Sequence, residues 1–354
     1  MSVIDPRPIL LDSTPEALAA YMPDLPGYRI KQLYAWLTLG HGFATMSDLP
    51  LALRTALAEA YIAQPVTVAQ TLTAPDGTQK YLFSLAADAE TVEGVAMGYK
   101  HGTTLCLSTQ VGCRMGCSFC SSGLDGLLRN LTPGEMLGEA IAVNALRGGT
   151  ADKRAVTNLV LMGMGEPLDN YDNVVKFLRL VSAPAGLNIS QRNISLSTCG
   201  IVPAIHRLAD EGLGVNLTIS LHATTDEARA RNMPVARAYP LSDLIAAARA
   251  YFDKTGRRVI FEYVMLKDEN MSAEDVTRLS RLLRGFPAHV NLIMLNPGPK
   301  RAAPCSPRDA YRFLDALTAA GLSATIRRSM GGKILGACGQ LRRRAVGQNQ
   351  AEAE

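Results

Sequence analysis

Apolar residues in the first part of the chain recur every three or four positions, the spacing that places them on one face of an α-helix. This pattern continues to about residue 62, and Pro50 divides it into short helices. Residues 65–100 instead show partial apolar alternation around a turn signal at Asp76-Gly77, which predicts a β-hairpin. We therefore expect a helical accessory domain over residues 1–64, followed by a β-hairpin connector.

Beyond residue 100 the pattern changes to repeated units of an apolar strand followed by an amphipathic helix. Such repeats predict an α/β fold with a parallel sheet, and six of them favour a sheet curved into a partial (β/α)6 barrel. We assign this core to residues 101–341 and a basic, then disordered, tail to residues 342–354. The expected strands are residues 103–108, 157–163, 193–197, 215–222, 258–266, 289–295 and 322–328.

Unusual polar segments follow five of these strands directly. A cysteine loop follows the first strand, and the segments GMGEP, STCG, SLHA and NPGP follow the second, third, fourth and sixth. In parallel α/β folds the chemistry gathers at the carboxyl ends of the strands. The sequence therefore predicts an active site on that rim of the barrel.

Composition limits the classes of protein to which the chain can belong. Hydrophobic residues make up 47% and charged residues 19% of its 354 residues, the balance of a globular enzyme with a sizeable core. No apolar run approaches the roughly 20 residues that cross a bilayer, and the start of the chain does not resemble a secretion signal. We therefore expect a cytoplasmic protein.

The chain has seven cysteines, an odd number that argues against a disulfide framework. Three of them, Cys113, Cys117 and Cys120, form a C-x3-C-x2-C motif after the first barrel strand. Three thiolates on one loop can bind three irons of a 4Fe–4S cluster and leave the fourth iron without a protein ligand. The alternative is zinc, but structural zinc prefers two separated ligand pairs, and the sequence has no second CxxC or HxxxH pair.

Several longer segments make the chain resemble one branch of the radical S-adenosylmethionine (SAM) superfamily. They are YRIKQLYAWL, TTLCLSTQVGCRMGCSFC, NLVLMGMGEPLDNY, ISLHATTDEARARNMPV and ACGQLRRR. Together they are similar to the RlmN family, dual-specificity methyltransferases that act at C2 of adenine in 23S ribosomal RNA and in tRNA. The resemblance covers nearly the whole chain and implies SAM and a 4Fe–4S cluster as cofactors.

Two positions favour this family over its relatives of the Cfr type, which methylate C8 of the same ribosomal adenine. Cfr-like sequences tend to read QCGC and GMGEA, whereas this chain has Val111 and Pro167 at the distinguishing positions. C8 methylation stays an alternative, as does a non-catalytic RNA-binding protein that uses the cluster structurally. Such a binding protein would need neither Cys106 nor Cys338.

The resemblance implies a catalytic role for two cysteines and one carboxylate. Cys338 matches the methyl carrier, whose thiolate takes a methyl group from one SAM before a radical from a second SAM activates that methyl for addition to adenine. Cys106 matches the cysteine that helps to remove the proton and forms a disulfide with Cys338. Glu93 matches the proton acceptor. The sequence alone describes Cys106 as a core residue and Glu93 as an exposed carboxylate.

The resemblance also implies a set of SAM contacts. Gly165 and Glu166 form the GE segment, in which glycine permits close approach and the carboxylate can accept from the ligand's ammonium group. Strand alternation places Ser220 and His222 on one face, although a buried structural histidine is the alternative. The remaining implied contacts are Ser197, Leu221 and Asn296.

The implied partners are 23S rRNA, tRNA and a low-potential electron donor such as flavodoxin or ferredoxin, with no membrane and a monomeric chain. The net charge is only +4, but arginines crowd toward the C-terminus, which suits either phosphate contact or a solvated basic end. We expect RNA contacts from Arg29, Lys31, Arg54, Arg327, Arg328, Arg342, Arg343 and Arg344.

The chain departs from the family pattern close to the catalytic region. Ala236 stands where relatives usually carry asparagine, and Lys333 and Leu335 replace aspartates. We expect these changes to affect the geometry of the C-terminal catalytic loop or the preference for RNA, and to leave the activity in place. Cys199 and Cys305 match no assigned role and are interpreted as structural.

Overall fold

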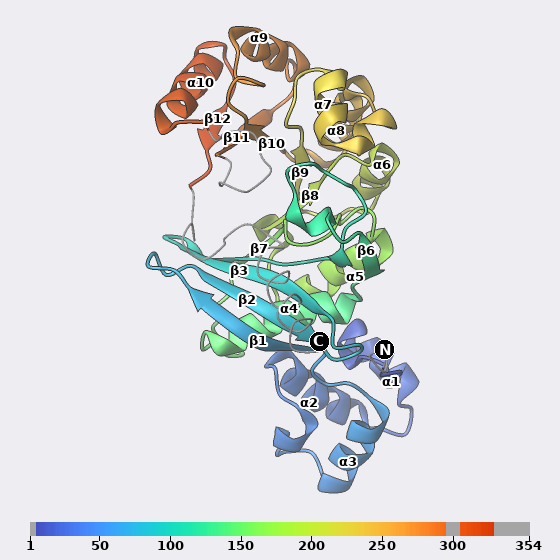
Figure 1. Ribbon diagram of the computed structural model, residues 1–354. Coiled ribbons are helices and arrows are strands. Elements are labelled where there is room, and N and C mark those ends of the chain that lie inside the picture. Colours follow the sequence, from blue (N-terminus) through green and yellow to red (C-terminus); the bar gives the residue numbers. More distant parts are fainter. Residues whose placement is uncertain (1–4, 295–304, 329–354) are drawn as a thin grey trace.

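The computed structural model describes residues 5–294 and 305–328, in which helices at one end, antiparallel strands in the middle and a strand–helix repeat at the other end follow one another (Figure 1). Asp12, in a short 3-10 helix (Leu10–Asp12) before the N-terminal helices, ties this end of the chain to the repeat, because its carboxylate accepts the N–H of Gly134 at 2.6 Å. Pro50 directly precedes the third helix, so the expected break is confirmed. These helices are α1 (Pro15–Tyr21), α2 (Gly27–Thr38) and α3 (Leu51–Ala60).

Ten strands of the described chain form one continuous sheet. All seven strands expected beyond residue 100 are present, and neighbours along the sheet from β4 to β12 pair in parallel. The region expected as a hairpin has three antiparallel strands. The turn at Asp76-Gly77 joins the first two, and the third pairs with β4, which extends the barrel sheet. The strands of this sheet are β1 (Val66–Thr73), β2 (Gln79–Leu85), β3 (Thr91–Tyr99), β4 (Gly102–Cys106), β7 (Asn158–Leu161), β8 (Ile194–Thr198), β9 (Asn216–Ser220), β10 (Val259–Met265), β11 (Ala288–Met294) and β12 (Ala324–Ile326), and a separate ribbon consists of β5 (Gln110–Gly112) and β6 (Leu127–Asn130).

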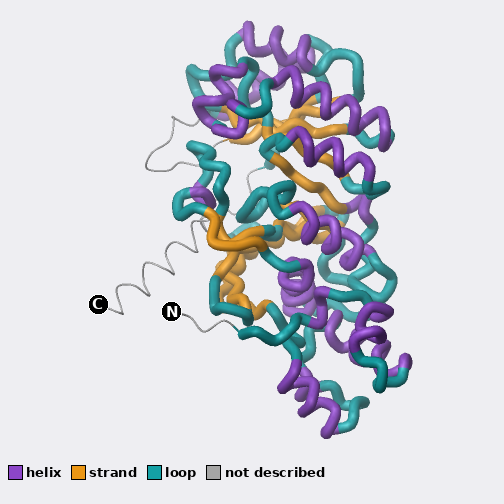
Figure 2. The backbone as a smooth tube through the Cα atoms, turned by 90° about the vertical axis from the view of Figure 1, so that its right-hand side faces the viewer, coloured by secondary structure: helices purple, strands orange, loops and turns teal. Residues whose placement is uncertain are grey.

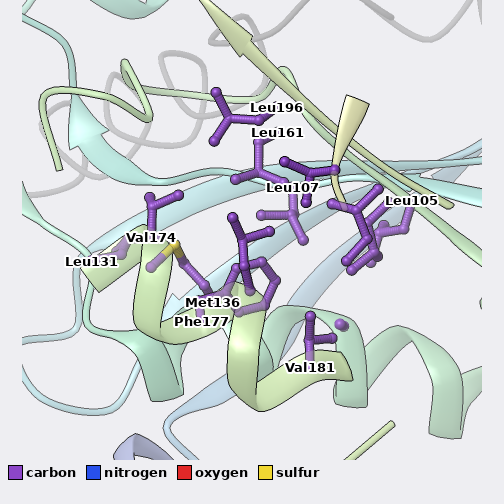
Figure 3. Packing of buried hydrophobic residues seen from close by; sticks show 14 of the residues in the cluster. Leu105, Leu107, Leu131, Met136, Leu161, Val174, Phe177, Val181 and Leu196 are labelled. Atoms are coloured by element: carbon purple, nitrogen blue, oxygen red, sulfur yellow. The ribbon is translucent and has the colours of Figure 1, made fainter. Parts of the chain in front are cut away.

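Helices between the parallel strands gather along one side of the sheet (Figure 2). Leu105 and Leu107 share a buried cluster with Phe177 on that side (Figure 3). Because side chains alternate along a strand, Cys106 between the two leucines points to the opposite, inner face. None of the described helices is long and apolar enough to cross a membrane. The helices of the repeat are α4 (Pro133–Leu146), α5 (Tyr171–Ser182), α6 (Val202–Asp210), α7 (Asp226–Asn232), α8 (Leu241–Thr255), α9 (Ala273–Leu282) and α10 (Pro307–Ala319).

Candidate active site

The carboxyl ends of the parallel strands surround a cavity of about 240 Å³. The cysteine loop after β5 closes one side of it with Cys113, Cys117 and Cys120. The parallel pairing therefore brings together groups that lie more than a hundred residues apart in the sequence. Of the other predicted residues, those on the cavity wall are Gly165, Glu166, Ser197, Ser220 and His222.

The three loop cysteines suit an iron–sulfur cluster better than a single ion. No disulfide joins them to another described cysteine. Burial, with a contribution from the neighbouring thiols, raises the pKa of Cys113 to about 11 and that of Cys117 to about 12. In a 4Fe–4S cluster each thiolate binds its own iron, so three thiols on one loop match three of the four irons.

The GE segment is held tightly between β7 and β8. Gly165 has φ +105°, and a Cβ there would lie 2.7 Å from the Cβ of Gln110, so only glycine fits. The buried Glu166 carboxylate accepts the N–H of Cys199 at 2.7 Å and that of Leu168 at 3.0 Å. Burial raises the pKa of Glu166, and these two N–H donors oppose the rise. The carboxylate keeps lone pairs for a further donor from the cavity.

His222 reaches the cavity by a different route from the one expected. The strand β9 ends at Ser220, and His222 has φ +57°, so strand alternation does not continue to it. Its Nδ1 accepts the N–H of Val264 at 3.1 Å, which leaves the ring proton on Nε2. Burial and the charge of Arg229 lower the pKa of His222 to about 3, so the ring is neutral. Leu221, between them, is fully buried in the hydrophobic core.

Cys106 lies beside the cavity on the inner face of the sheet. It packs in a small buried cluster with Val95 and Met97 of β3, against Val160 and Met162. Met162 also lines the cavity, so the cluster that contains Cys106 adjoins the space enclosed by the loop cysteines. Cys106 is therefore a core residue, as the sequence alone suggests, and it also lies next to the cavity.

Glu93 is buried, so the expectation of an exposed carboxylate is wrong. The side chains of Glu93 and Lys80 are 2% and 0% exposed, and Lys80 Nζ lies 2.9 Å from Glu93 Oε2. Antiparallel pairing of β2 with β3 brings the two residues together. Glu93 is two positions from Val95 on β3 and so shares the inner face with Cys106.

Three further side chains line the cavity, a position that the sequence analysis did not predict for them. Cys199, interpreted as structural, lines the cavity, and burial beside Glu166 raises its pKa far above the usual range. Glu262 is buried, and its carboxylate accepts a hydrogen bond from Asn291 Nδ2 at 3.0 Å. It is the one acidic residue in the apolar strand VIFEYVM, a sequence signal that could have identified it as a site residue. Arg327 also lines the cavity, with Nη1 3.6 Å from Met162 Sδ.

The residues expected to bind RNA fall into different environments. Arg29 Nη1 donates to the carbonyl of Asp48 at 2.7 Å, and Arg54 Nη1 donates to that of Ala44 at 2.6 Å, so both arginines brace the helical domain. Lys31 and Arg328 are exposed. The predicted residues that lie outside the described ranges are Asn296, Lys333, Leu335, Cys338, Arg342, Arg343 and Arg344.

Replacing Lys80 by methionine should lower the free energy of unfolding by about 3–5 kcal/mol, because it leaves the Glu93 carboxylate buried without its cation. The double variant Lys80→Met/Glu93→Gln should recover most of this loss. Urea unfolding monitored by circular dichroism measures both, with Lys100→Met as the exposed control. Equal stability of Lys80→Met and Lys100→Met would contradict the buried pair.

Known proteins resemble the chain over nearly its full length. The model of the radical SAM superfamily matches residues 107–280. Probable dual-specificity RNA methyltransferases RlmN from Lachnoclostridium phytofermentans and Symbiobacterium thermophilum are 48% and 46% identical to it, covering 89% and 93% of this chain and 88% and 90% of theirs. The crystal structure of a radical SAM methyltransferase from Sphaerobacter thermophilus superposes with a TM-score of 0.89 at 41% identity, over 94% of this chain and 98% of that one. The chain therefore belongs to the RlmN family of radical SAM RNA methyltransferases.

Proposed function

We propose that this enzyme methylates C2 of an adenine in 23S rRNA and in tRNA, with Cys338 as the methyl carrier and Cys106 as its partner. The observation that carries the proposal is the position of Cys106 on the inner face of the barrel, against a methionine that also lines the cavity. A protein that only bound RNA would have no use for a thiol there. A reaction that ends in a disulfide between two cysteines needs one.

The cavity walls suit the two cofactors of the family. Cys113, Cys117 and Cys120 would hold the 4Fe–4S cluster, which when bound supplies the electron that cleaves SAM. Glu166 would accept a hydrogen bond from the ammonium group of SAM. Ser197 and Ser220 offer hydroxyls, and His222 offers its Nε2–H, to the rest of that ligand.

The inner face beside the cavity supplies the groups for proton removal. The Lys80 ammonium holds the carboxylate of Glu93 in one position at 2.9 Å. Val95 and Met97 surround Cys106 with apolar side chains, which exclude water from the thiol. In this arrangement Cys106 works next to the adduct, and Glu93, further along the same face, accepts the proton.

Further features of the proposal concern the site of methylation and the partners. Val111 and Pro167 support C2 over C8, since Cfr-like sequences differ at both positions. We also propose that a low-potential donor such as flavodoxin or ferredoxin reduces the cluster. The enzyme would act as a monomer in the cytoplasm, where both RNA substrates occur.

Incubation of the reconstituted enzyme with SAM, a reductant and protein-free large-subunit RNA should yield 2-methyladenosine, detected by mass spectrometry of the digested RNA. Cys338→Ala should abolish the product, because no methyl carrier remains. Cys106→Ala should instead trap RNA covalently on the protein, visible as a shifted band on a denaturing gel. 8-Methyladenosine would contradict the proposal, and so would undiminished product from Cys338→Ala.

The variants Arg327→Met and Arg328→Met should have different effects, because Arg327 lines the cavity whereas Arg328 is exposed and expected to contact RNA phosphate. Arg327→Met should lower the single-turnover rate at saturating RNA by about tenfold or more and leave the salt dependence of RNA binding unchanged, because its side chain faces the cavity. The exposed Arg328 should show the reverse, with the slope of log affinity against log salt reduced by about one. Filter binding at several salt concentrations measures the slopes, and identical behaviour of the two variants would contradict this assignment.

A further inference from the structure

Arg229 of α7 is the bulkiest side chain that is completely buried in the described part of the chain. Its Nη2 donates to the carbonyl of Cys199 at 2.5 Å and to that of Ser220 at 3.1 Å, and its Nε donates to that of Leu221 at 3.3 Å. These carbonyls follow or end β8 and β9. The guanidinium therefore ties together two strand ends on the rim of the cavity.

These bonds leave one part of the guanidinium unsatisfied. Nη1 of Arg229 is buried and has no hydrogen-bond partner among the described residues. Arginine stays protonated in proteins and carries five N–H donors, so a buried Nη1 needs an acceptor. A buried donor without a protein partner indicates a group that the protein binds.

The helix that carries Arg229 is hydrogen-bonded to the cysteine loop. Ser118, next to Cys117, donates its N–H to the carbonyl of Asn232 and its hydroxyl to the Asn232 amide oxygen, both at 2.9 Å. Asn232 follows Arg229 by three residues on the same helix, so the two side chains share one face. The charge of Arg229 lowers the pKa of Cys117 against the effect of burial, and it interacts in the same way with Cys199.

Packing fixes the guanidinium in this position. Gly200, with φ +103°, lies opposite it, and a Cβ there would be 3.2 Å from Arg229 Nη2 and 2.8 Å from Leu244 Cδ1. Only glycine leaves this space free. The cation cannot turn away toward solvent, because the side chain is wholly enclosed.

We propose that Arg229 tunes the iron–sulfur cluster: when the cluster is bound, Nη1 donates to one of its sulfide ions, and the buried positive charge raises the reduction potential. The inference rests on the proposed function, because it requires that the cluster be bound. Hydrogen bonds to the sulfurs and nearby charge are among the factors that set such potentials. A cation favours the reduced state because reduction adds one negative charge to the cluster.

A redox titration of the reconstituted enzyme, followed by electron paramagnetic resonance, tests the inference. At the midpoint potential of the wild type, Arg229→Met should show a roughly tenfold lower ratio of reduced to oxidised cluster, which corresponds to a shift of about 59 mV for one electron. Arg229→Lys keeps the charge and should lie between the two. The matched control is Arg231→Met, since Arg231 is exposed on the same helix two residues later. A cluster in Arg229→Met with full iron content and an unshifted potential would overturn the inference.

A second measurement serves if Arg229→Met does not fold or does not retain iron. Wild-type enzyme labelled with 15N-arginine and reduced without SAM should show, by electron–nuclear double resonance, a 15N coupling to the cluster. The coupling should persist in Arg231→Lys and vanish in Arg229→Lys. Its absence from the wild type overturns the inference alone, whereas a wild-type chain that binds no cluster overturns the proposed function as well.

Discussion

Parallel hydrogen bonding from β4 to β12 is the constraint on which the site depends, because it brings the carboxyl end of every barrel strand to one rim. The pairing register then sets which side chains of neighbouring strands lie side by side. Ser220 pairs with Glu262, and Glu262 pairs with Asn291, so three polar residues from consecutive strands lie in one row. Two of them line the cavity, and the amide of the third holds the carboxylate of Glu262. A shift of one residue in any pairing would turn this row toward the apolar helices.

The same strand pairing brings most of the buried charged groups on the inner face near an opposite charge. The carboxylate of Glu93 is compensated by Lys80, and burial raises the pKa of Glu262 against the opposing charge of Arg327. Arg229 is instead satisfied on two of its three nitrogens only. The loop thiols and this partly unsatisfied guanidinium therefore both lie near the cavity in which a charged cofactor would bind.

Features of short range were predictable from the sequence, and those that depend on pairing were not. The cysteine motif, the turn at Asp76-Gly77 and the barrel strands each follow from neighbouring residues. The burial of Glu93 depends instead on the register of β2 against β3, in which Lys80 pairs with Val95 and so lies diagonally opposite Glu93. The entry of His222 into the cavity depends on one left-handed backbone conformation after the strand ends, which no periodicity indicates.

Ala236, which stands where relatives usually carry asparagine, lies in a turn that packs against the cysteine loop. Ala236 is buried in the turn Pro234–Arg237 directly after α7, and its N–H donates to the carbonyl of Met233 at 3.0 Å. Pro234 in this turn lies against Gly116 of the cysteine loop, 3.6 Å from the position of a Cβ there. An alanine at a buried site brings no polar group that needs a partner, so the turn can stay closed. Ala236 therefore lies buried in a turn that packs against the cysteine loop, and its side chain is not part of the exposed surface.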